Sequence, residues 1–275
     1  MSAVNPASIT MGRAPGAPLR VLHGGAIAWF VAALLSQWLF AAYIVAAYGM
    51  PLAAGTPEAM NRTHPITGHV PGDHLGNTVL LFHLLPAIWL NLAGLLQLVP
   101  RLRQRYPILH RINGRVFLIL ALSGALSGLL LTWVRGSRLS DIGALGTTLN
   151  GILIVLAVVL TWRLARLRQF AAHRRWAIRC YLLVSGVWMF RLGYTAWLTL
   201  NQGPFGNTRQ MDGPFDLFWS VACYGLPLAI AEIYFRSERA SGTRQWLVGG
   251  LLGLCALFTL TGTATAYWIL WRPHF

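Results

Sequence analysis

Long apolar runs separated by short polar segments dominate this chain. The first run extends from about Gly24 to Tyr48. The later runs lie at residues 77–99, 114–134, 144–165, 175–200, 214–236 and 246–271. A helix rises about 1.5 Å per residue, so about 20 apolar residues cross the hydrocarbon core of a bilayer. The pattern therefore predicts an all-α, polytopic membrane helix bundle with about seven transmembrane helices.

The segments outside these runs are short. The first run is longer than the apolar core of a signal peptide, which has roughly 7–15 residues. We therefore expect a retained first helix. The chain then divides into a cytoplasmic N-terminal tail (1–23), a single transmembrane domain (24–271) and a short outer tail (272–275).

Basic residues are distributed unequally between the two ends of the runs. All 22 are arginine, and sixteen lie in the N-terminal tail and in the segments 101–115, 163–179 and 236–244. Five lie in the segments on the other side. Because cytoplasmic loops of membrane proteins carry the excess of positive charge, we expect the N-terminus inside and the C-terminus outside. The expected location is the bacterial inner (cytoplasmic) membrane, with contacts to its lipids.

Composition narrows the function classes. Hydrophobic residues make up 56% of the chain and charged residues 11%, far below the charged fraction of soluble proteins. The net charge of +15 comes from arginines at the ends of apolar runs, so we do not expect nucleic-acid binding. Three cysteines without a CxxC pattern indicate no disulfide framework. GxSxG, HExxH and GxxxxGK are absent, so any enzymatic activity would be that of a membrane oxidoreductase.

A basic signature occurs twice. Residues Arg101–Arg115 read RLRQRYPILHRINGR, and RLRQ recurs at 166–169. The pair His110-Arg111 recurs as His173-Arg174. Each copy joins one apolar run to the next. The repeat predicts two similar helical hairpins that carry a His-Arg pair at the cytoplasmic end.

The repeated pairs indicate a binding site at this end. Helix N-termini and arginine side chains favour phosphate and carboxylate groups. The residues expected to contribute are His110, Arg111, Arg115, His173, Arg174, Arg175 and Arg179. One interpretation is a site for an anionic or quinone-like ligand, or for the propionates of a haem held by one or both histidines. The other is that these groups bind lipid phosphates.

A second set of candidates lies within the apolar runs, where polar groups are costly and often functional. It comprises His83, Gln97, Arg191 and Glu232. His83 lies roughly 9 Å and Arg191 roughly 13 Å from the outer ends of their helices, at 1.5 Å per residue. They would be neighbours if the second and fifth helices touch, which would form a polar site for a cofactor or an anionic substrate. Alternatively, Arg191 extends outward and His83 is a hydrogen-bonded interior residue.

The outer segment 49–76 contains three histidines, His64, His69 and His74, near Glu58 and Asp73. Imidazole and carboxylate groups suit zinc, copper or iron. The spacing of five is not that of a helical ligand pair, and proline and glycine make the segment irregular. A divalent metal site and a solvated loop are both compatible with this pattern.

The polar positions together resemble a known family. They are His83, Gly94-x-x-Gln97, Arg101 and Arg103, Pro107-x-x-His110-Arg111-x-x-Gly114-Arg115, His173-x-x-Trp176-x-x-Arg179 and Arg191. They resemble the bacterial multi-pass membrane-protein family DUF2306 over about residues 75–235, although Ala177 stands where the family pattern suggests Met. HRxxGR is also similar to helix starts in cytochrome b561-like and ferric-reductase-like haem proteins. Those place paired histidines within their spans, whereas here only His83 is mid-span.

Three functions are compatible with these residues. The first is a redox protein that binds haem b or a quinone and works with a redox partner. His83 and His110 are too far apart for one iron, so two histidine ligands would be His110 with His173, or His83 with a loop histidine. The second is a permease for a small anionic or lipid-like solute, with the hairpins as parallel repeats. The third is a non-catalytic membrane subunit.

Overall fold

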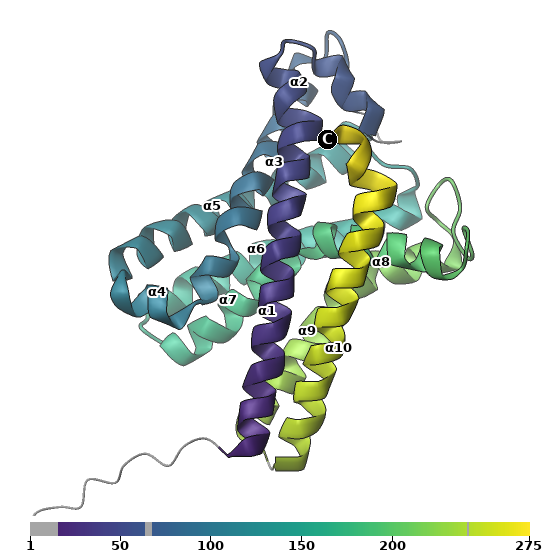
Figure 1. Ribbon diagram of the computed structural model, residues 1–275. Coiled ribbons are helices and arrows are strands. Elements are labelled where there is room, and N and C mark those ends of the chain that lie inside the picture. The colour runs from purple at the N-terminus through teal and green to yellow at the C-terminus, as the bar shows by residue number, and fades with distance from the viewer. Residues whose placement is uncertain (1–15, 64–67, 241) are drawn as a thin grey trace, which may run out of the picture.

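The structure is a computed structural model that describes residues 16–63, 68–240 and 242–275 (Figure 1). Within these residues the chain is helical and contains no β-strand. The predicted all-α class is therefore confirmed.

The helices follow the apolar runs closely. They are α1 (Ala17–Ile44), α2 (Met50–Ala53), α3 (His74–Ala93), α4 (Pro100–Arg105), α5 (Pro107–Trp133), α6 (Asp141–Arg166), α7 (Phe170–Val184), α8 (Gly186–Leu200), α9 (Pro214–Ser237) and α10 (Gly242–Ala266). Short 3-10 or π turns occupy Val45–Gly49, Pro57–Thr63, Leu95–Leu98, Tyr267–Trp271 and Arg272–His274. Proline is the first residue of α4, α5 and α9, where its missing N–H has no helical acceptor to lose.

Six helical segments of the described chain are long and apolar enough to cross a membrane. The single helix predicted over 175–200 is wrong, because that segment is interrupted at Ser185, where ψ is −2°. The resulting helices α7 and α8 have 15 residues each, about 22 Å, and neither alone spans a bilayer core of about 30 Å. They follow one another across the molecule and together complete the membrane bundle (Figure 1).

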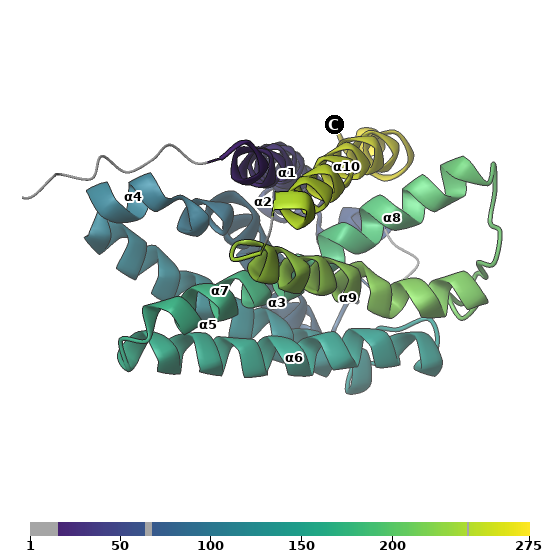
Figure 2. The same cartoon turned by 90° about the horizontal axis from the view of Figure 1, so that it is seen from below.

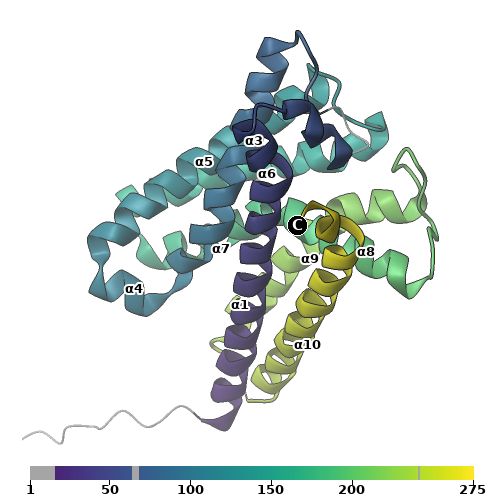
Figure 3. The ribbon, with the colours of Figure 1, turned by 45° about the horizontal axis from the view of Figure 1, so that its top comes forward.

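Helices α1 and α10 form a long parallel pair along one side of the molecule (Figures 1 and 3). Their approach depends on glycine. A Cβ atom on Gly249 would lie 2.7 Å from the carbonyl oxygen of Val21, and a Cβ on Gly25 would meet the Gly249 backbone. The Gly249-x-x-x-Gly253 pattern thus marks a close helix contact through its first glycine.

The other helices complete a bundle around the interrupted segment. Helix α1 packs on α3, α3 on α5, α5 on α6 and α6 on α9. Seen from below, α6 lies on the side opposite α1 and α10, with α9 between them (Figure 2). Helix α7 packs on α6 and α9, and α8 packs on α9 and α10. Cys180, Tyr181, Trp188 and Leu192 are buried, so the middle of this segment lies in the core.

The bundle has two distinct ends. We call the end with residues 100–107, 166–170 and 237–242 the basic end, and the end with residues 53–74, 133–141 and 200–214 the opposite end. Helix α1 starts at the basic end and the chain finishes at the opposite end (Figure 1). The assignment of the basic end to the cytoplasm stays a prediction.

Tryptophans near the helix ends fall into two groups. Trp133, Trp162, Trp246 and Trp268 are exposed, as expected of residues at a membrane interface. Trp219 and Trp271 lie near helix ends too, but they are buried within the bundle. The Trp219 indole donates to the Phe190 carbonyl at 2.9 Å, and Trp271 packs against the rings of Phe40 and Tyr43. Their position in the sequence does not reveal this tertiary packing.

Candidate functional site

The two repeated His-Arg pairs open two helices in the same way. His110 is the fourth residue of α5 and His173 the fourth of α7. The His110 backbone N–H donates to the Tyr106 carbonyl at 3.1 Å, and that of His173 donates to the Gln169 carbonyl at 2.8 Å. Both capping residues have ψ of 66°. The repeat therefore has equivalent geometry at the helix starts.

The RLRQ segments before these starts differ. The first forms most of the separate helix α4, whereas the second begins at the last residue of α6. The second then turns through Arg168, whose φ is 57°. The two hairpins are therefore similar only from the residue before each helix onward.

A large cavity of about 1550 Å³ opens at the basic end, and residues of both hairpins line it. We call it the basic-end cavity. His110 and His173 both line it, and so do Gln97, Arg111 and Arg115. Its walls come from helices that are distant in sequence, including Trp29 and Phe30 of α1 and Phe258 of α10. With Arg174, six of the residues predicted to bind a ligand thus share one cavity.

The fully charged side chains that line the basic-end cavity are all arginines. The arginines that line it are Arg103, Arg111, Arg115, Arg166, Arg168 and Arg174, and no aspartate or glutamate of the described chain lines it. Arg174 pairs with Glu238 at 3.0 Å. Among the described residues, none of the other arginines of this group forms an ion pair. An apolar interior with a cationic rim favours a ligand with an apolar body and an anionic group.

His173 has a defined tautomer when neutral. Its Nδ1 atom lies 3.0 Å from the carbonyl oxygen of Thr161, and a carbonyl can only accept a hydrogen bond. Nδ1 therefore carries the proton and Nε2 carries a lone pair. His110 is close enough to His173 and Arg103 to interact with them electrostatically.

Two arginines that were predicted to bind a ligand at this end, Arg175 and Arg179, do not line the basic-end cavity. Arg179 donates to Glu232 at 2.7 Å and its guanidinium lies 4.8 Å from the ring centroid of Trp176. Arg179 was expected to contact a ligand, but its charge is already compensated by Glu232 on α9. Arg175 likewise packs over Phe235, 5.8 Å from its centroid. These residues join α7 to α9.

A second, smaller cavity of about 180 Å³ lies in the half nearer the opposite end. We call it the small cavity. His83 of α3 and Arg191 of α8 both line it, and Arg191 is close enough to act electrostatically on His83. The two residues are therefore neighbours, as their predicted depths suggested.

His83 fits into a groove on α5. Its Nδ1 atom lies 3.0 Å from the Gly124 carbonyl and 3.2 Å from the Ser127 hydroxyl. A Cβ atom on Gly128 would lie 3.0 Å from the His83 ring. The Gly124-x-x-x-Gly128 pattern thus provides space for an imidazole. Because the Gly124 carbonyl can only accept a hydrogen bond, Nδ1 of the neutral His83 ring carries the proton and Nε2 carries the lone pair.

Arg191 remains partly within the bundle. Its Nη1 donates to the Val187 carbonyl one turn earlier at 3.1 Å. Its guanidinium lies 5.3 Å from the ring centroid of Phe40, a cation–π distance. The side chain is therefore held against α1.

Sequence reasoning missed several polar residues of the small cavity, among them Gln37 of α1 and Asn150 of α6. Both line it, and their exposed fractions are only 1% and 8%. The available signal was a carboxamide in the middle of an apolar run, which is as costly in a bilayer as the residues that were considered.

The predicted metal site at the opposite end stays a prediction. His64 lies outside the described residues. His69 faces Glu58 with Nδ1 and Oε1 3.7 Å apart, and His74 is the first residue of α3. Within the described part of the chain, no three His, Cys, Asp or Glu side chains form a group that could hold a metal.

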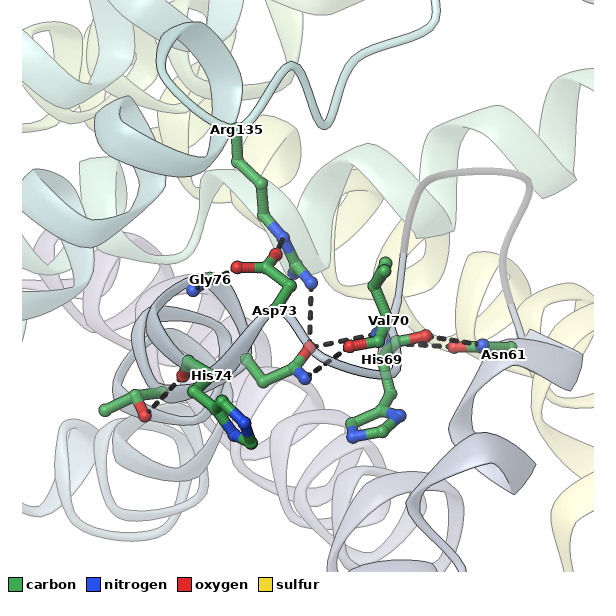
Figure 4. Close-up of polar contacts among 9 residues, drawn as sticks. Asn61, His69, Val70, Asp73, His74, Gly76 and Arg135 are labelled. Carbon is green, nitrogen blue, oxygen red and sulfur yellow. Dashed lines mark hydrogen bonds and ion pairs between the residues drawn. The ribbon is translucent and has the colours of Figure 1, made fainter.

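Asp73 of this segment has a structural role (Figure 4). Its carboxylate accepts from the Gly76 N–H and from Arg135 Nε, each at 2.8 Å. These hydrogen bonds hold the pKa of Asp73 below its usual value of 3.8. Arg135 also donates to Asn77 at 2.8 Å. The end of α5 is thereby tied to the start of α3.

Comparison with known proteins gives one family. Residues 80–214 match the family described as "Predicted membrane protein (DUF2306)". The matched segment includes both repeated His-Arg pairs and extends from His83 to Arg191 and beyond. The predicted resemblance is thus confirmed. Comparisons with curated proteins and with solved structures give no match.

Proposed function

Since residues 80–214 of this multi-pass membrane protein belong to the DUF2306 family, we propose for the whole chain a redox-linked function in which the basic-end cavity binds haem b. One observation carries this proposal. Two histidines from separate helices line the same largely apolar cavity, and among the described residues arginines line it but no aspartate or glutamate does.

The donor set suits haem in three respects. Haem has a large apolar body, which the cavity of about 1550 Å³ can accommodate. It has two propionates, which arginine binds with charge-assisted hydrogen bonds. Its iron accepts imidazole nitrogen, and a ligating histidine usually donates its other N–H to a carbonyl or carboxylate. His173 has that arrangement with Thr161.

The residues then have distinct roles. His110 and His173 would hold the iron, and Arg111 and Arg115 would hold the propionates. Haem supplies one-electron chemistry when bound, with a potential that depends on its axial ligands and burial. The Thr161 carbonyl fixes the His173 ring so that Nε2 is available. The surrounding apolar side chains limit access of water.

The absorption spectrum tests the proposal. Full-length protein would be purified in detergent from cells supplied with a haem precursor. We expect a Soret band that is lost or strongly shifted in His110→Ala and His173→Ala. His23→Ala is the matched control, because His23 is exposed near the same end and does not line the cavity. A colourless wild-type protein, or unchanged spectra in both variants, would contradict the proposal.

A permease for a lipid-like anion is the second candidate. The interruption of α7–α8 at Ser185 in the core favours it, because transporters often bind their substrates at discontinuous helices. Mass spectrometry of an organic extract of the purified protein separates the candidates. A stoichiometric lipid anion without haem supports the permease. A stoichiometric quinone instead supports a redox protein of the quinone-binding type.

A further inference from the structure

We propose that the small cavity is a second binding site, specific for a small carboxylate that also carries a hydroxyl or ammonium group. This site is separate from the basic-end cavity, and its assignment does not depend on haem. Tyr181 borders both cavities and forms a shared part of their walls. The argument uses the hydrogen-bonding groups of the small cavity, its charge and its size.

The first observation is a buried acceptor on Asn150. Its Nδ2 atom donates to the Leu183 carbonyl at 3.2 Å near the end of α7. Because a carbonyl only accepts, this contact fixes the orientation of the carboxamide. The Oδ1 atom therefore points away from the Leu183 carbonyl, and it has no hydrogen-bond partner among the described residues.

Gln37 provides a second acceptor from the other side of the bundle. Its Nε2 donates to the Ser185 hydroxyl at 3.0 Å, at the interruption between α7 and α8. Its Oε1 atom is buried and accepts no direct hydrogen bond within the described chain, and the Tyr181 hydroxyl close to this carboxamide makes none either. Leaving a buried acceptor unsatisfied costs free energy, so such atoms indicate a partner that donates hydrogen bonds.

His83 adds a third acceptor. Its Nδ1–H is directed to Gly124, which leaves the Nε2 lone pair for a ligand. Three side chains from α1, α3 and α6 thus present acceptor atoms around one cavity. The Tyr181 hydroxyl can donate to only one of them, so a ligand that itself donates hydrogen bonds satisfies them better than one without hydroxyl or N–H groups.

The charge of the cavity selects an anion. Arg191 lines it, whereas no aspartate or glutamate in the part of the chain that the structure describes does. A metal ion or an organic cation would be repelled by this guanidinium and would find no carboxylate. A carboxylate group can pair with Arg191 while the rest of the ligand donates to the acceptors.

Size restricts the ligand further. At about 30 Å³ per water molecule, a cavity of about 180 Å³ holds roughly six waters. This is smaller than the pockets of about 300–1,000 Å³ that hold drug-sized ligands. Haem and lipids are therefore excluded. Carboxylates of two to four carbons, such as glycolate, lactate or glycine, are of suitable size.

Thermal unfolding of the detergent-purified full-length protein tests the assignment. Lactate, glycolate and glycine would be titrated and compared with propionate and acetate, which have the carboxylate but lack the donor group; lactate and propionate also have the same net charge. We expect at least one donor-bearing carboxylate to raise the melting temperature with a Kd at least tenfold lower than that of its counterpart. Equal effects of the two classes, or no effect of any of them, would overturn the assignment.

Variants locate the binding site. Arg191→Gln should abolish the stabilisation, and Gln37→Leu or Asn150→Leu should remove the preference for donor-bearing carboxylates. Arg209→Gln, on an exposed outer segment, is the control with the same change of charge. If one leucine variant does not fold, Arg191→Gln and the other leucine variant still test whether the ligand binds in the small cavity. Binding that survives Arg191→Gln would show that the site is elsewhere.

The same titration in His173→Ala separates this inference from the proposed function. We expect small-carboxylate binding to be unchanged in that variant, whereas its haem absorbance is lost. Loss of carboxylate binding in His173→Ala would contradict a separate site. Absence of haem in the wild type would leave the expected carboxylate binding intact.

Discussion

The basic-end cavity and the small cavity are lined by the same types of polar residue but differ in volume and burial. Both combine histidine with arginine, and both present an imidazole whose Nδ1 faces a backbone carbonyl. The basic-end cavity is about 1550 Å³ and its arginines lie mainly at exposed helix starts. The small cavity is about 180 Å³ and is bordered by buried carboxamides. Residue type therefore does not determine the ligand, whereas burial and volume restrict it strongly.

The difference follows from the path of α7 and α8. Helix α7 starts at the basic end, where six arginines border a wide opening. At Ser185 the segment turns in the core, and α8 continues along α9 and α10. The turn exposes backbone and hydroxyl groups that Gln37 and Asn150 contact. The same interrupted segment thus borders a large, mainly apolar cavity in one half and a small polar cavity in the other.

The largest effect is expected from removing cationic groups of the basic-end cavity. Arg111→Gln with Arg115→Gln should weaken haemin binding to the apo protein at least tenfold. A hydrogen bond to a charged group contributes about 1.5–3 kcal/mol, less where solvent screens it, and about 1.4 kcal/mol is a tenfold change. Haemin titration followed by absorbance measures the Kd.

The matched control for this variant lies in the same segment. Arg101→Gln with Arg105→Gln removes the same charge from the basic end, but neither residue lines the cavity. We expect its haemin affinity to be close to wild type. Equal losses in the two double variants would indicate that the overall positive potential, and not the cavity, attracts the ligand.

A smaller effect is expected from two glycines of α5. A Cβ on Gly128 meets the His83 ring at 3.0 Å, whereas a Cβ on Gly124 meets no atom within 4 Å. Gly128→Ala should therefore be less stable than Gly124→Ala by about 1–2 kcal/mol, since overpacking costs about 1–3 kcal/mol. Alanine is otherwise favoured over glycine within a helix. Denaturant unfolding in detergent measures the difference, and equal stabilities would be inconsistent with the position of His83.

The smallest effect concerns acid sensitivity at the opposite end. The folded-state pKa of Asp73 is lowered, first by the Gly76 N–H and then by Arg135. Its contribution to stability is therefore present above the unfolded pKa of about 3.9 and is lost as pH falls through the lower folded value. Thermal unfolding between pH 6 and pH 3 should show a smaller decrease for Asp73→Asn than for the wild type. Parallel pH profiles would argue against this role.

Much of the candidate site could be predicted from local patterns. His110 and His173 were recognised because each follows a basic segment and opens an apolar run. His83 and Arg191 were recognised because they interrupt such runs. Arg179 could not be distinguished from Arg115 in this way, because its pairing with Glu232 depends on how α7 packs on α9. Gln37 and Asn150 lie in different helices, and only the packed bundle makes them neighbours.

By itself, the sequence determined the all-α membrane class, the approximate helix boundaries and the basic end, because hydropathy and charge act locally along the chain. Only the tertiary structure decided that Ser185 interrupts a helix, that Trp219 and Trp271 are buried and that two cavities lie on either side of Tyr181. These features depend on contacts between helices distant in sequence. In an apolar chain many side chains could face either lipid or a neighbouring helix, and hydropathy is the same for both.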